Sequence, residues 1–165
     1  MNLLNPILDS FRFARDYSKS LLADIPDDQW FTMPGGITHI GWQVGHLASA
    51  ELRLGLIRIR GPKPVDDEIF PMSIRQYFQK DDTPRSDPKV YPSPARLREI
   101  LDCVREQLLL ELPIYTDAQL VEPLDVPHRL CKTKGDCLVW APRHELTHAG
   151  QIGLLRRQLG HKPQW

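Results

Sequence analysis

Two histidines four residues apart near the C-terminal end are the first candidates for chemistry. His144 and His148 occupy the string HELTH, and a helix there would place both imidazoles on one face with Cβ atoms about 5–6 Å apart. At about 100° per residue they share a sector with four apolar residues, Ala141, Ile152, Leu155 and Leu159. We therefore expect both rings to point into the core, either as hydrogen-bonded core histidines or as ligands of one metal ion.

His46 is the third candidate, and it lies in the middle of another apolar segment, GWQVGHLA over residues 41–48. A lone histidine in such a segment is more often a core residue than a ligand. Three imidazoles from two adjacent core helices would, however, form a three-histidine site with open coordination positions, which is typical of catalytic rather than structural metal sites. The helix pattern permits His46 to face the other pair without establishing that it does.

The string His-Glu-x-x-His also matches a metalloprotease pattern in which the glutamate is a general base. That pattern needs a third ligand downstream, yet position 154 is a leucine and no Asp or Glu follows Glu145. We therefore reject the protease interpretation. Glu145 falls at the margin of the apolar face, and three roles stay open for it: a hydrogen-bond partner of a ligand, a base for bound water, or a solvated charge.

Four amphipathic or apolar segments are predicted to form the helices that position these residues, over residues 3–24, 38–60, 93–112 and 140–159. Thr38 is the predicted N-cap of the second helix, which is apolar almost all round and is therefore expected to be central. The fourth helix is predicted to begin near Trp140, because Pro142 fits only in a first turn unless it kinks the helix.

The connections between these helices are long. Residues 62–92 are rich in Pro and Asp and are expected to contain one short helix near residues 73–79, while residues 113–137 are expected to be irregular. Long crossovers argue against a simple up-down-up-down arrangement. The sequence predicts an all-α fold, a four-helix bundle with long crossover connections, as a single domain over residues 1–165.

Composition excludes several classes of protein. Lys+Arg and Asp+Glu both total 21, so no basic excess indicates nucleic-acid binding. One cluster of cations near the end of the second predicted helix suits the helix dipole instead: Arg53, Arg58, Arg60 and Lys63. No apolar run is long enough to span a membrane, and no basic segment precedes an apolar one near Met1, so a cytoplasmic location is expected. An odd, small number of cysteines (three) agrees with a reducing compartment, although a disulfide between Cys131 and Cys137 stays open.

The segment HELTHAGQIGLLRRQLG, residues 144–160, resembles the closing helix of the DinB-like superfamily of DinB/YfiT-like metalloenzymes. The Gly-x-x-His-Leu-Ala pattern around His46 is similar to the second helix of that family. The resemblance covers essentially the whole chain. It implies a four-helix bundle that binds a divalent metal ion, nickel or zinc, through His46, His144 and His148, and it implies a homodimer.

The resemblance also implies a class of reaction. Several relatives act with low-molecular-weight thiols, which they transfer or conjugate to a small-molecule substrate, and our leading hypothesis is a metal-dependent transferase of this kind. A metal-dependent hydrolase with Glu145 as base and a non-catalytic metal-binding or stress-response interaction module are the alternatives. The residues that bind the thiol in those relatives are not identifiable in this sequence.

Overall fold

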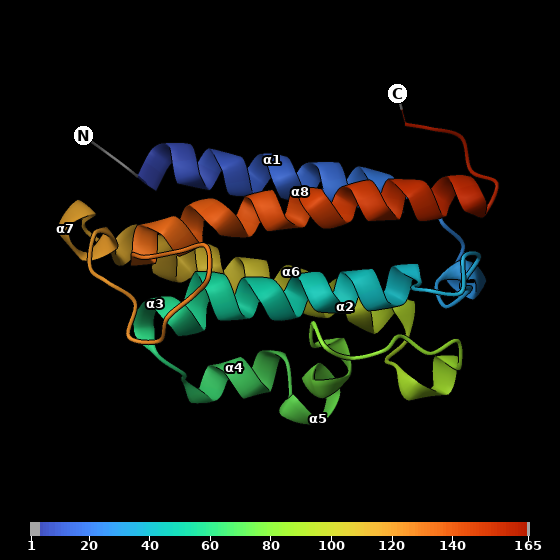
Figure 1. Cartoon of the computed structure of the whole chain (residues 1–165), viewed down its shortest axis with the longest axis horizontal. Helices are drawn as coiled ribbons and strands as arrows, with labels where there is room; N and C mark the ends of the chain where they lie inside the picture. The colour runs from blue at the N-terminus through green and yellow to red at the C-terminus, as the bar shows by residue number, and fades with distance from the viewer. Residues whose placement is uncertain (1–3, 165) are drawn as a thin grey trace.

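The computed structural model describes residues 4–164 and shows an all-α fold (Figure 1). Four long helical segments form the bundle: α1 (Leu4–Leu22), α2 (Ile40–Glu51) continued by the π-helical turn η2 (Leu52–Ile57) and by α3 (Arg58–Arg60), α6 (Pro94–Glu111) and α8 (Lys134–Gln158). The connections hold the short helices α4 (Pro64–Ile69), α5 (Met72–Arg75) and α7 (Asp117–Leu120) and the short 3-10 turns η1 (Asp27–Gln29), η3 (Gln76–Phe78), η4 (Pro88–Val90) and η5 (Leu112–Ile114). The predicted fold class is confirmed.

The order of helix directions follows from the long crossovers. α1 and α8 run parallel to one another, and α2 and α6 run in the opposite direction (Figure 1). The parallel arrangement of α1 and α8 is visible in their contacts, since Arg15 on α1 binds Glu145 on α8 and Leu21, further along α1, accepts from Arg156. Residues 61–93 carry the chain back from the end of α3 to the start of α6, as the predicted crossover requires.

α2 is the central helix, as its apolar composition predicts. Every residue from Ile40 to Glu51 is buried. Two of its glycines let other segments approach the helix backbone: a Cβ atom on Gly45 would lie 2.4 Å from the ring of Phe78, and one on Gly41 would lie 2.5 Å from Phe31. The absence of a side chain at Gly45 therefore lets the crossover segment before α6 pack directly against the middle of α2.

The predicted boundaries differ most for the fourth helix. α8 begins at Lys134 rather than near Trp140, so the prediction that Pro142 lies in its first turn is wrong. A capping box begins the helix: Thr133 accepts from the backbone N–H of Asp136, whose carboxylate accepts from the N–H of Thr133. This cap stabilises the added N-terminal turns, and Pro142 is accommodated in the interior of the helix.

The remaining differences are small. His39 rather than Thr38 is the N-cap of α2. The helix expected near residues 73–79 is present as α5 followed by η3, while α4 and α7 were not predicted. Cys131 and Cys137 are both free thiols, so they form no disulfide. None of the helices between residues 4 and 164 has the length and the apolar character that a membrane crossing needs.

Candidate metal centre

His46, His144 and His148 converge in the interior of the bundle between α2 and α8. One ring nitrogen from each lies within 4.8 Å of those of the other two, and the ring centroids are 4.5–5.4 Å apart. His46 and His148 are buried, whereas His144 keeps partial contact with solvent. The structure therefore brings together all three histidines that the sequence singled out.

Hydrogen bonds fix the orientation of two of these rings. The Nδ1 atom of His46 lies 2.8 Å from the carbonyl oxygen of Phe78, and because a carbonyl only accepts, that nitrogen carries the proton. The Nδ1 atom of His148 lies 2.6 Å from Oε1 of Gln43, whose amide nitrogen donates to Thr38. In both rings the Nε2 atom is consequently left with a free lone pair, the form in which histidine binds a metal ion.

The three imidazoles are held neutral. The pKa of His144 is lowered to about 4 and that of His148 to about 3, mainly by burial and secondly by the neighbouring imidazoles. Burial is also the main cause that lowers the pKa of His46. Neutral rings are required of metal ligands, because a protonated nitrogen has no lone pair to offer.

The spacing of the nitrogens fits a divalent ion. Nε2 of His148 lies 3.2 Å from Nε2 of His144, and two nitrogens that bind one tetrahedral zinc ion at 2.0–2.1 Å lie roughly 3.3 Å apart. Either a proton shared along a hydrogen bond or a cation between them can occupy this short gap. With a third neutral imidazole from His46 beside the pair, the donor set suits a divalent transition-metal ion, and three ligands leave at least one position of a tetrahedral ion unfilled.

Trp42 and the other three histidines lie outside the candidate ligand set. Trp42 stacks on His46, with ring centroids 4.8 Å apart and planes 10° from parallel, and so covers one side of that ligand. His39 caps α2 by accepting from the backbone N–H of Trp42. His128 lies in the connection before α8 and His161 follows α8, where it contacts Gln29.

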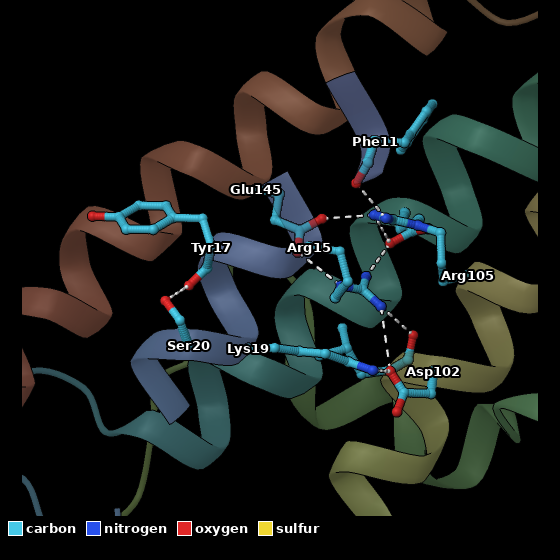
Figure 2. Close-up of polar contacts among 10 residues, drawn as sticks. Phe11, Arg15, Tyr17, Lys19, Ser20, Asp102, Arg105 and Glu145 are labelled. Carbon is cyan, nitrogen blue, oxygen red and sulfur yellow. Dashed lines mark hydrogen bonds and ion pairs between the residues drawn. The ribbon is translucent and has the colours of Figure 1, made fainter. Parts of the chain in front are cut away.

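Glu145 does not point toward the histidine cluster. Its two carboxylate oxygens accept from Arg15 and Arg105, both at 2.8 Å, and the residue is 4% exposed (Figure 2). Glu51 binds the same two arginines at 2.5–3.1 Å. These four residues, the charge cluster, supply one buried charge from each of α1, α2, α6 and α8. The interpretation of Glu145 as a solvated charge is therefore wrong, and its oxygens are occupied rather than available to a bound water.

Two groups that orient the ligands were missed by sequence reasoning. Gln43 lies three residues before His46 on the same helix, so it faces the same side as that ligand, and this spacing is a signal that the sequence contains. The carbonyl of Phe78 carries no such signal. Its position depends on the packing of the crossover against Gly45, which only the three-dimensional structure shows.

Comparison with known proteins agrees with this architecture. The family model of the DinB superfamily matches residues 10–152. The fold is similar to the crystal structure of a conserved protein from Enterococcus faecalis, with a TM-score of 0.73 and 20% sequence identity, covering 96% of this chain and 97% of that one. No curated protein gives a significant sequence match. At this level of identity, the structural likeness shows the fold alone.

Proposed function

This chain belongs to the DinB superfamily, and on that basis we propose that it is a metal-dependent transferase that acts with a low-molecular-weight thiol. The observation that carries the proposal is the convergence of three neutral imidazoles from α2 and α8. Two of them are held by Gln43 and by the Phe78 carbonyl in the form that binds a metal ion. Such ligand orientation supports a metal site rather than three unrelated core histidines.

The protein's own groups supply binding and orientation. A divalent ion held by three neutral ligands would retain its full charge and would lower the pKa of a thiol that reached an open position. The ring of Trp42 covers one side of His46, and the partly exposed His144 leaves an approach from solvent on its own side. The surrounding helices would hold the second substrate against the thiol, which removes most of the entropy cost of their encounter.

The proposed reaction is a substitution at an electrophilic carbon. The thiol sulfur forms the new bond to carbon, and the bond between that carbon and its leaving group breaks. The leaving group departs with the electron pair of the broken bond, and the thiol proton passes to solvent. No oxidant or reductant is needed.

The structure argues against a hydrolase in which Glu145 is the base. That alternative assigned Glu145 as the base for a bound water, yet both oxygens of Glu145 are engaged by arginines inside the charge cluster. Among residues 4–164, the three-histidine group is the only set of three or more His, Cys, Asp or Glu side chains placed to share an ion, so no other carboxylate belongs to it.

The test compares thiol-dependent and thiol-independent chemistry on one preparation. Zinc- or nickel-loaded protein is mixed with glutathione or N-acetylcysteine and 1-chloro-2,4-dinitrobenzene, and separately with p-nitrophenyl acetate without thiol. We expect conjugation that saturates with thiol concentration and that His148→Ala abolishes. Ester hydrolysis without thiol would support the hydrolase instead, and a metal-loaded protein inactive in both assays would support the non-catalytic module.

A further inference from the structure

Four cations lie near the end of the α2–α3 segment, and the structure gives partners to three of them. Arg60 and Lys63 form ion pairs with Glu111. Arg58 donates to backbone carbonyl oxygens of the connection before α8. Within residues 4–164, the Arg53 guanidinium has no hydrogen-bond or ion-pair partner. Its expected role as a solvated helix-end charge does not explain why it is half-buried.

Arg53 lies on the same side of the α2–α3 segment as His46. It follows His46 by seven residues, or about two helical turns, which places it on the same side of the segment. The turn η2 that carries it packs against α8, the helix of the other two histidines. The positive charge of Arg53 contributes to lowering the pKa of His46 and of His144, after the larger effect of burial, so the guanidinium is electrostatically close to both.

A surface cavity of about 320 Å³ lies beside this guanidinium. Arg53 and Arg58 contribute its two cations, and Asp125 is its only acidic residue. Burial and the nearby charge of Arg58 both lower the pKa of Arg53, while Asp81 opposes them weakly. Asp81 is exposed and also lies 4.0 Å from Lys80, and its effect on the pKa of Arg53 is smaller than that of Arg58. The cavity therefore combines positive charge, partial burial and a donor group without a partner.

We propose that Arg53 binds a carboxylate of the substrate or thiol that occupies the histidine site. A planar guanidinium presents two parallel N–H groups that match the two oxygens of a carboxylate. A half-buried guanidinium without a partner has lost part of its hydration, and an anionic ligand would restore those hydrogen bonds. Asp125 on the cavity wall disfavours a doubly charged phosphate more than a singly charged carboxylate.

This inference rests on the proposed metal site, since the anion is placed beside the metal ligands. With three neutral imidazoles and a divalent ion, the site and Arg53 together would carry a charge of +3. Such a site favours anionic over neutral molecules of the same size, both in affinity and in the rate of encounter. A thiol that bears a carboxylate a few bonds from its sulfur fits both groups.

The test uses cobalt-loaded protein, whose visible spectrum reports ligand binding without any turnover. Two thiols of similar size are titrated, 3-mercaptopropionate with a carboxylate and 2-mercaptoethanol without a charge, and propionate is titrated as a carboxylate without a thiol. We expect Arg53→Gln to weaken 3-mercaptopropionate and propionate by roughly tenfold or more and to leave 2-mercaptoethanol unchanged. Arg53→Lys should keep part of the preference, and Arg157→Gln, which removes an exposed arginine of α8, should change nothing.

The outcomes separate this inference from the proposed function. If wild-type protein binds propionate and loses it in Arg53→Gln but binds no thiol, the carboxylate inference holds and the thiol reaction fails. If wild-type protein binds both thiols with equal affinity, the inference is overturned while the thiol reaction survives. Equal affinity of the wild-type protein for the two thiols would overturn the inference even if Arg53→Gln does not fold, which circular dichroism and cobalt stoichiometry would reveal. In that case Arg53→Lys tests whether a measured preference depends on Arg53.

Discussion

Replacing Glu145 with glutamine should destabilise the protein by about 3–5 kcal/mol, because the substitution leaves an uncompensated positive charge in the interior. The charge cluster contains two arginines and two glutamates, each 4–6% exposed, so its charges cancel only when all four are present. In Glu145→Gln, Arg15 and Arg105 would share the carboxylate of Glu51. Asp102, which is 39% exposed and lies 3.8 Å from Arg15, would offset only part of the remaining positive charge. The shape of the side chain is retained, so the loss measures charge rather than packing.

Urea unfolding followed by circular dichroism measures this loss, with Asp9→Asn as the matched control. Asp9 pairs with Arg12 at 3.0 Å, but both side chains are more than 60% exposed, so that substitution should cost less than about 1 kcal/mol. At roughly 2–4 °C per kcal/mol, Glu145→Gln should lower Tm by about 6–20 °C. A loss no larger than that of Asp9→Asn would refute the account of the charge cluster as a tightly coupled buried group.

Two further predictions concern the histidine cluster. Gln43→Leu removes the acceptor for Nδ1 of His148, so zinc affinity measured by competition with a chelator should fall roughly 10–100-fold. Gln43→Glu keeps an acceptor and should retain most of the affinity. Equal zinc affinities of the wild-type protein and Gln43→Leu would contradict this role of Gln43. Metal-free protein should lose stability as the pH falls below 6.5. In the unfolded chain His144 and His148 then become protonated, whereas in the folded chain, with pKa values of about 4 and 3, they stay neutral until the pH is far lower. Between pH 6.5 and 5 each should cost about 1.6 kcal/mol. Unfolding of His148→Ala should therefore depend less steeply on pH over that interval, and an unchanged slope would show that His148 is not held neutral.

Periodicity predicts the helices of this chain well because each buries a distinct apolar surface. The all-round apolar character of α2 correctly indicated that it lies in the centre of the bundle, where all its residues are buried. The predicted start of α8 is too late because Pro142, which favours a first turn, lies inside the helix instead. The capping-box pattern from Thr133 to Asp136 was the stronger local signal.

Interactions between distant segments could not be predicted in the same way. The side toward which Glu145 points depends on two arginines that precede it by 130 and 40 positions in the chain. Likewise, the ion pairs of Arg60 depend on the packing of Asp66 on α4 and Glu111 on α6 around it. By contrast, the convergence of His144 and His148 follows from helical spacing alone, and that of His46 was indicated by family resemblance.

Metal stoichiometry tests the central claim most directly. Protein purified without an affinity tag is exposed to zinc or nickel, freed of excess ion and measured by elemental analysis, alongside His148→Ala and the control His161→Ala, which removes a histidine outside the cluster. We predict one ion per chain in wild type and His161→Ala and none in His148→Ala. Full retention of the ion by His148→Ala, or no bound ion in the wild-type protein, would contradict the assignment of the three histidines as a metal site.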